Sequence, residues 1–309
     1  MTRTYGIISD MHEIDIRALV PAIEILKKVE AEALVLNGDL FGERSKYRAV
    51  DYFATVLDIT GKSNLETYVL PGSHETVEEF EHVLNIFTKK YGNIINTFGT
   101  RKIEKEDHHL VFLQGSDWRA GNAIQNGYSL ENQNESGLYQ NDNGGLIRIV
   151  NMNDLKKIVN KPEKTIVFSH VPRKFDSADK GVDMAEFWEV FTPFKIENRD
   201  IEVGTVLPGP AGYRLANIGA PIKLKKENRG NEYLKKIFEE LGIRKNITGH
   251  FHESCGRAND LKGNFVEEGT FVDELFYNAS YMDKLKAGIV TVSDSKIAYE
   301  NINLREFIG

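Results

Sequence analysis

The sequence predicts an α/β fold with two stacked sheets in a single domain. The first ninety residues alternate strand-like runs with amphipathic helical patterns, which argues for a parallel sheet with right-handed crossovers. Each early strand ends in a polar cluster, which is where α/β sheets place ligands. The tail beyond residue 264 is rich in further strand-like runs, and no linker separates it from the rest of the 309-residue chain.

The first half contains three strands, each followed by a helix. YGIIS is a short strand that ends at Asp10, and apolar residues at helical spacing predict a helix over about 15–30. ALVLN ends at Gly38-Asp39, and the next helix has one apolar face running from Tyr47 to Leu57. ETYVLPG is stopped by Pro71-Gly72, and a third helix with apolar residues from Val77 to Phe87 follows.

The middle of the chain is less regular. NIINTF, RKIEKE and HLVFLQG are typical of short strands, whereas residues 118–145 lack apolar periodicity and predict a long loop. A short helix is expected over 153–159, and TIVFS is a buried strand ending at His170. Residues 186–229 are rich in aromatics and prolines and receive no clear assignment; extra core or a dimer contact is favoured over a substrate lid.

The last part returns to regular patterns. EYLKKIFEELG is a helix stopped by Gly242, and IRKNIT is a strand leading into Gly249. Four strand-like runs in the tail predict an antiparallel second sheet: NFVEEG, FVDELFY, AGIVTV and KIAYENI.

Composition bounds the environment and the partners. A hydrophobic fraction of 41% and a charged fraction of 28% are ordinary for a soluble globular protein. The net charge of −7 does not favour nucleic acid as a partner. Cys255 is the only cysteine, so we expect no internal disulfide and a cytoplasmic protein. The N-terminus lacks the apolar run of a signal peptide, and no segment is apolar for long enough to span a bilayer.

Five short segments each place polar residues just after an apolar run. His250 and His252 stand in ITGHFH, where a spacing of two puts both imidazoles on one side of an extended backbone. The other four segments are ISDMH with Asp10 and His12, LNGDL with Asp39, LPGSHE with Ser73, His74 and Glu75, and FSHVPR with His170.

The donors in these segments suit divalent metal ions. Two carboxylates and four imidazoles are ligands for Mn, Fe, Zn or related ions, and there is no second cysteine for a thiolate site. Six ligands exceed the needs of one tetrahedral ion but suit two ions with a shared carboxylate. Two such ions about 3.5–4 Å apart can activate a bridging hydroxide and neutralise charge during phosphoryl transfer.

The order of these segments resembles the calcineurin-like metallophosphoesterases, whose pattern is D-x-H, G-D, G-N-H-[DE], H and G-H-x-H. The resemblance runs from residue 5 to about residue 252 and implies a four-layer α/β/β/α sandwich with two mixed sheets. It implies that Asp10, His12 and His252 bind a first metal, that Asp39 bridges, and that His170 and His250 bind a second. It also implies that His74 stabilises phosphoryl oxygens and protonates the leaving group, with Glu75 orienting it.

One position departs from the family pattern, because Ser73 stands where the family usually has an asparagine whose carbonyl binds the second metal. A serine hydroxyl is shorter and, while neutral, a weaker donor. Three outcomes follow: Ser73 binds through a water, the second site is weak, or one tightly held ion does most of the work.

Each candidate residue also has an ordinary structural interpretation. Asp10 and Asp39 could be turn or cap residues, and Glu75 could simply favour a helix N-terminus. Asp117 and Trp118 could line the pocket. Arg44 and Arg173 could contact phosphate, with a surface ion pair as the alternative for each.

The expected function is metal-dependent hydrolysis of phosphate monoesters or diesters through a dinuclear centre and a bridging hydroxide. The expected cofactors are two divalent ions, Mn first, with Fe, Zn, Ni, Co or Mg as alternatives. A small phosphorylated substrate is expected, and a homo-oligomer is open. The competing hypotheses are a catalytically weak binding or scaffold protein with this fold, motivated by Ser73, and a nuclease.

Overall fold

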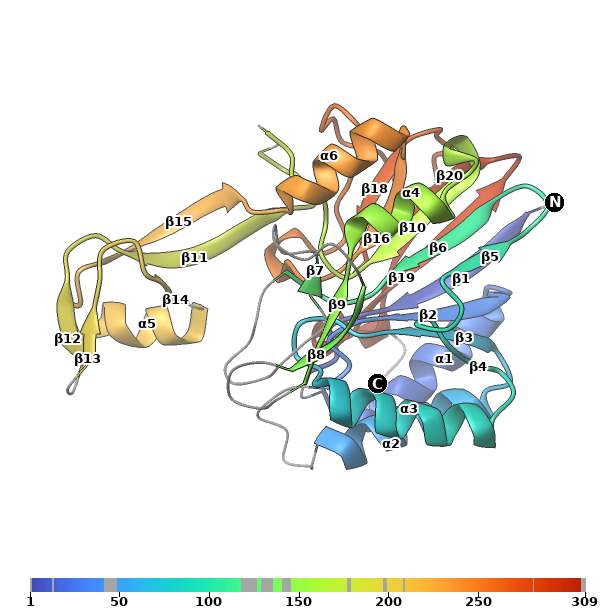
Figure 1. The fold of residues 1–309 in the computed structure, drawn as a ribbon, viewed down its shortest axis with the longest axis horizontal. Helices are drawn as coiled ribbons and strands as arrows, with labels where there is room; N and C mark the ends of the chain where they lie inside the picture. The colour runs from blue at the N-terminus through green and yellow to red at the C-terminus, as the bar shows by residue number, and fades with distance from the viewer. Residues whose placement is uncertain are drawn as a thin grey trace.

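The computed structural model describes residues 2–12, 14–41, 49–117, 127–128, 136–140, 146–176, 179–196, 199–207, 209–279 and 281–306. Its body consists of two six-stranded sheets (Figure 1). The first sheet has the order β20-β19-β1-β2-β3-β4, in which β1 to β4 are parallel, β19 is antiparallel to β1, and β20 is antiparallel to β19. Its strands are β1 (Arg3–Ile8), β2 (Ala33–Asn37), β3 (Glu66–Leu70), β4 (Ile94–Asn96), β19 (Lys286–Ser293) and β20 (Lys296–Asn303).

The second sheet has the order β17-β18-β16-β10-β6-β5. Its four central strands are parallel, and β5 and β17 pair antiparallel at the two edges. The strands are β5 (Lys102–Glu104), β6 (His109–Leu113), β10 (Thr165–Ser169), β16 (Lys245–Thr248), β17 (Ala258–Asn259) and β18 (Leu275–Asn278).

The central strands are apolar on both faces because both faces are covered. In β1, Ile8 packs with the helices of the first half, whereas Tyr5 and Ile7 point the other way. The side chains between the sheets include Phe112 and Phe168 of the second sheet, both fully buried. Alternation along a strand thus divides its side chains between two cores.

Helices cover the outer faces of the two sheets (Figure 1). On the first sheet they are α1 (Leu19–Lys28), α2 (Ala49–Lys62) and α3 (Val77–Lys90). On the second sheet they are α4 (Leu155–Ile158) and α6 (Glu232–Leu241). Thr76 caps α3 by accepting a hydrogen bond from the Glu79 N–H, and Gly242 ends α6 in the left-handed conformation. The predicted α/β fold with two large mixed sheets is confirmed, while the single-domain organisation stays a prediction.

Residues 184–228 form an arm that projects from the body (Figure 1). The arm contains β11 (Met184–Val190), β12 (Phe194–Ile196), β13 (Arg199–Ile201), β14 (Val206–Leu207), α5 (Gly209–Asn217) and β15 (Ile222–Asn228). Asp183 joins the two ends of the arm, because its carboxylate accepts hydrogen bonds from the Phe175 N–H, the Asn228 side chain and the Gly230 N–H. The aromatic stretch therefore builds a separate element rather than additional core of the body.

Two other parts of the chain also differ from the expectation. The tail does not form a second antiparallel sheet: β18 joins the second sheet parallel to β16, while β19 and β20 extend the first sheet from the free edge of β1. NFVEEG forms no strand beyond an isolated bridge at Phe265. Within the segment predicted as a loop, the described residues include β7 (Gly127–Tyr128) and β8 (Gly137–Gln140), which pair with β9 (Leu146–Val150). Sheet membership depends on long-range pairing, which local alternation does not specify.

Among the described residues, no helix is both long and apolar enough to cross a bilayer.

Candidate metal centre

The predicted site residues follow the carboxyl ends of five strands that belong to both sheets. Asp10, Asp39 and His74 come after β1, β2 and β3 of the first sheet, and His170 and His250 come after β10 and β16 of the second. Asn37 joins the two sheets at this edge, since its side-chain amide donates to the Ser169 carbonyl at 3.1 Å. The sequence segments therefore converge although they are far apart along the chain.

The backbone at the site is held in an unusual conformation. Asp10, His12, Asp39 and His250 all have positive φ values, of 52°, 42°, 51° and 72°. Non-glycine residues rarely adopt this region, and such residues concentrate at functional sites. The sequence predicts an extended backbone at GHFH with both imidazoles on one side. His250 instead adopts the left-handed conformation, and the imidazoles of His250 and His252 face different partners.

Asp10, His12 and His252 form the first ligand group. Their ligand atoms lie within 4.8 Å of one another. The Nε2 atoms of His12 and His252 are 3.1 Å apart, and the His252 Nε2 is 3.2 Å from Asp10 Oδ1. The backbone N–H of His250 donates to both Asp10 oxygens, at 3.1 and 3.2 Å, and so fixes this carboxylate.

Asp39, His170 and His250 form the second ligand group, within the same 4.8 Å limit. The His170 Nε2 lies 3.1 Å from Asp39 Oδ2, and its Nδ1 donates to the Asn37 carbonyl at 2.9 Å. That second hydrogen bond fixes the orientation of the ring, so that Nε2 faces the group. Asp39 also forms a third group with His12 and His74, so its carboxylate connects all parts of the centre.

Ser73 turns toward Asp39. The Ser73 hydroxyl is 2.8 Å from Oδ2 and 3.1 Å from Oδ1, and the backbone N–H groups of Ser73 and His74 donate to Oδ1. Gly72 makes this approach possible, because a Cβ there would lie 2.4 Å from Asp39 Oδ1. Gly249 is constrained in the same way, since its Cβ would meet Asp10 Oδ2 at 2.4 Å.

The Glu75 side chain is buried and accepts hydrogen bonds from two backbone N–H groups. Its Oε1 accepts from the Leu40 N–H at 2.5 Å, and its Oε2 accepts from the Gly72 N–H at 2.7 Å. These bonds join the loop after β2 to the loop after β3, so both carboxylate oxygens support the segments around Asp39. Glu75 thus connects the two loops. The expectation that it orients His74 stays a prediction.

The electrostatics of the centre require positive charge. Burial alone would raise the pKa of both aspartates, but the neighbouring histidines hold the pKa of Asp10 and of Asp39 below the ordinary value. Burial opposes a charge on His170, yet the adjacent Asp39 carboxylate raises the pKa of His170 to about 10. Burial lowers the pKa of His12 to about 4 and that of His250 to about 3, so these two imidazoles present lone pairs at neutral pH.

The donor set therefore fits divalent cations. Buried carboxylates that keep their charge lie among imidazoles whose nitrogen atoms face a common point. The His170 Nε2 is a fully buried nitrogen with no neighbour but this carboxylate within hydrogen-bonding distance in the described part of the chain. A cation bound in the second group would be a partner for both the His170 nitrogen and the Asp39 carboxylate.

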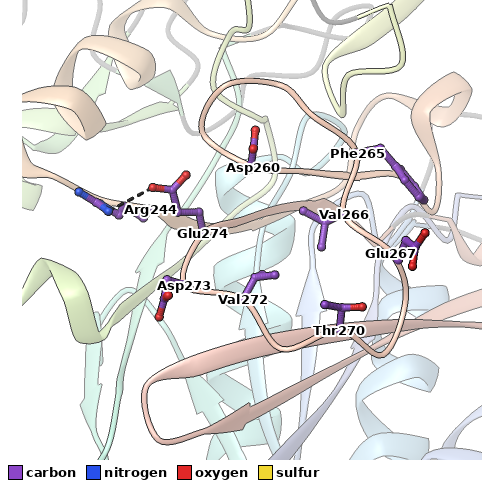
Figure 2. A pocket seen from close by; sticks show the side chains of 9 residues that line it. All are labelled: Arg244, Asp260, Phe265, Val266, Glu267, Thr270, Val272, Asp273 and Glu274. Atoms are coloured by element: carbon purple, nitrogen blue, oxygen red, sulfur yellow. Dashed lines mark hydrogen bonds and ion pairs between the residues drawn. The ribbon is translucent and has the colours of Figure 1, made fainter.

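A separate pocket lies elsewhere on the surface (Figure 2). It has a volume of about 620 Å³, and its lining includes Asp260, Glu267 and Asp273, as well as Arg244 and Glu274, which are paired at 3.1 Å. None of the predicted site residues lines it, so its acidic surface does not belong to the candidate metal centre.

Several further sequence candidates have other surroundings. Arg173 is buried, and its guanidinium lies over the rings of Phe175 and Phe276 and forms an ion pair with Glu239 at 3.9 Å. Asp117 accepts a hydrogen bond from the Asn231 amide at 2.6 Å. Arg44 and Trp118 lie outside the described residues.

Two further residues of the centre are not among the candidates that the sequence predicted. Asn37 anchors His170 through its carbonyl, and its place directly before Gly38-Asp39 was a usable signal. Tyr281 stacks on His252, with ring centroids 4.4 Å apart and an interplanar angle of 16°. It lies well beyond the last motif, and nothing in the local sequence marks it.

Comparison with known proteins agrees with this geometry. A family model described as calcineurin-like phosphoesterase matches residues 4–254, which is most of the chain. The protein therefore belongs to the calcineurin-like phosphoesterase family. No curated protein sequence gives a significant match.

The chain is similar to solved structures at low sequence identity. The TT1561 protein of Thermus thermophilus aligns with a TM-score of 0.56 and 11% identity, over 99% of this chain and 100% of that one. A dimetal phosphatase from Danio rerio aligns with a TM-score of 0.46 and 12% identity, over 98% and 99% of the two chains. At 11% identity, the similarity to the Thermus thermophilus protein supports the fold alone.

Proposed function

We propose that this protein hydrolyses phosphate monoesters or diesters of small phosphorylated compounds, with two divalent metal ions of which Mn²⁺ is the first choice. The supporting observation is the convergence of Asp10, His12 and His252 beside Asp39, His170 and His250, with Asp39 also facing His74. When bound, the two ions would activate water and neutralise charge on the phosphoryl group.

The chain's own residues would position the ester and move a proton. Asp10, His12 and His252 would hold one ion, and His170 and His250 the other, with Asp39 between them. His74 is half-buried, 3.8 Å from Asp39 Oδ2 and edge-to-face with His12. From there its imidazole would stabilise phosphoryl oxygens and protonate the leaving oxygen as the ester bond breaks.

The direct test is turnover of an aryl phosphate and an aryl phosphodiester. We expect hydrolysis of at least one substrate with added Mn²⁺ and loss of it after chelation, restored by adding Mn²⁺ again. No turnover of either substrate with Mn²⁺, Fe²⁺, Co²⁺, Ni²⁺, Zn²⁺ or Mg²⁺ would favour the scaffold alternative. Absence of binding to oligonucleotides at low salt would dispose of the nuclease alternative, because phosphate contacts are strongest there.

Ser73 sets the strength of the second ion in this proposal. The Ser73 hydroxyl donates its hydrogen bond to Asp39, and a serine has no side-chain carbonyl oxygen of the kind that an asparagine would offer to the ion. We expect Ser73→Asn to tighten the weaker Mn²⁺ site by about tenfold, which is ~1.4 kcal/mol, as measured by titration calorimetry. Ser73→Ala is the control, since it removes the hydroxyl without adding a ligand. Equal stoichiometry and affinity in the wild type and Ser73→Asn would contradict the prediction.

The arm offers a contact for a second copy of the chain. Several of its apolar side chains are exposed, including Phe191 at 60% and Ile218 at 78%. We expect a homo-oligomer by light scattering at micromolar concentration, and a shift to monomer in the double variant Phe191→Ser and Ile218→Ser, because apolar area leaves the contact. A monomeric wild type would refute this. The matched control is Val20→Ser on the body, at an apolar residue that is 49% exposed. A cytoplasmic location also stays a prediction.

A further inference from the structure

Tyr281 stands beside the first ligand group although it lies outside the part of the chain that the family model matches. The match ends at residue 254, and Tyr281 is in the connection between β18 and β19. Its side chain is only 5% exposed, and its ring lies nearly parallel to the His252 imidazole at 4.4 Å. A ring stacked this closely on the imidazole restricts rotation of the imidazole about its Cβ–Cγ bond, because a turned imidazole would collide with the ring.

The histidines of the centre are oriented by different means. His170 is fixed by the hydrogen bond from its Nδ1 to the Asn37 carbonyl. For His252, both hydrogen-bond contacts recorded among the described residues involve Nε2, the atom that faces Asp10 and His12. A ligand histidine normally has its other nitrogen held by an outer partner. At His252 the stacked tyrosine ring is placed to fix the plane instead.

The segment that carries Tyr281 is itself tied to both sides of the group. The Met282 N–H donates to the Ser9 carbonyl at 2.9 Å, and the Asp283 N–H donates to the Asp10 carbonyl at 3.2 Å. On the other side, the Ala279 N–H donates to the Thr248 carbonyl at 2.9 Å, just before Gly249. Tyr281 is therefore held at a constant position relative to Asp10 and to the segment that bears His252.

We propose that Tyr281 is a positioning residue for the first metal site, which orients His252 by stacking on its imidazole. The inference rests on the proposed function, because it assumes that His252 binds a metal ion. It assigns the effect to the ring and not to the hydroxyl. Tyr281→Phe should therefore retain the effect, and Tyr281→Leu should lose it.

The test is metal binding, measured without reference to turnover. Mn²⁺ titration calorimetry and the visible spectrum of the Co²⁺-loaded protein are compared for the wild type, Tyr281→Phe and Tyr281→Leu. We expect Tyr281→Leu to weaken the binding of one of the two ions by about tenfold, which is the lower end of the range for loss of an outer partner of a metal ligand. The same variant should change the Co²⁺ spectrum. Tyr281→Phe should stay within about twofold of the wild type, because the stacked ring remains.

The matched control is Tyr299→Leu, at a tyrosine that is 1% exposed and whose ring is 4.5 Å from the Tyr277 ring, between the two sheets. It should lose stability on thermal unfolding but keep both metal affinities. Wild-type affinities in Tyr281→Leu, equal losses in Tyr281→Phe, or equal losses in Tyr299→Leu would each overturn the inference while leaving the proposed function intact. A wild type that binds neither Mn²⁺ nor Co²⁺ would overturn both.

Discussion

Asp39→Asn is expected to lower kcat/KM for the better aryl ester by about 1,000-fold or more, which is ~4 kcal/mol of transition-state stabilisation. The Asp39 carboxylate belongs to two of the three ligand groups and lies 3.1 Å from the His170 Nε2. Asparagine has the same shape, but it lacks the charge and directs an amide N–H₂ toward one of its partners. The variant should therefore keep its fold, bind at most one Mn²⁺ tightly, and lose turnover.

The measurement combines steady-state kinetics with Mn²⁺ titration and a thermal unfolding curve. Asp51→Asn is the control, because it makes the same chemical change away from the centre. Asp51 is an exposed residue in the first turn of α2. Turnover by Asp39→Asn at the wild-type rate would sink the assignment of Asp39 as the shared ligand. A large loss in Asp51→Asn would show that the effect is not local.

Glu75→Gln is expected to destabilise the protein by about 1–3 kcal/mol, the usual cost of a buried backbone N–H that loses its acceptor. Each oxygen of Glu75 accepts from one N–H, of Leu40 and of Gly72. Glutamine offers a single acceptor oxygen, so one of the two N–H groups would face the amide N–H₂. Since these bonds fix the loops around Asp39, metal affinity should fall together with stability.

Urea unfolding of the metal-free protein measures the first effect, and Mn²⁺ titration measures the second. Glu78→Gln, at an exposed glutamate in the first turn of α3, is the matched control and should change neither. If Glu75 served only to orient His74, Glu75→Gln would reduce turnover while leaving the unfolding midpoint in place. That outcome would support the prediction that Glu75 orients His74 and would contradict a stabilising role for its bonds to the two loops.

The convergence of the candidate ligands was predictable because they follow buried strands, and the carboxyl ends of parallel strands meet at one edge. Asp10, Asp39 and His170 needed no further information. The roles of Ser73 and Glu75 were less accessible, because a side chain beside a motif histidine can turn toward either neighbouring loop. Sheet membership of the tail and the stacking of Tyr281 depend on contacts between residues distant in sequence, which local patterns do not encode.

The division of the ligands between the two sheets has a mechanical consequence. In the first group, Asp10 and His12 follow a strand of the first sheet and His252 follows a strand of the second. In the second group, Asp39 follows a strand of the first sheet, and His170 and His250 follow strands of the second. Each ion would then cross-link two layers that are otherwise joined at this edge by contacts such as that of Asn37 with Ser169. Metal loading would therefore stiffen the protein at this edge, and removal of the metal would leave the two sheets joined there by protein contacts alone.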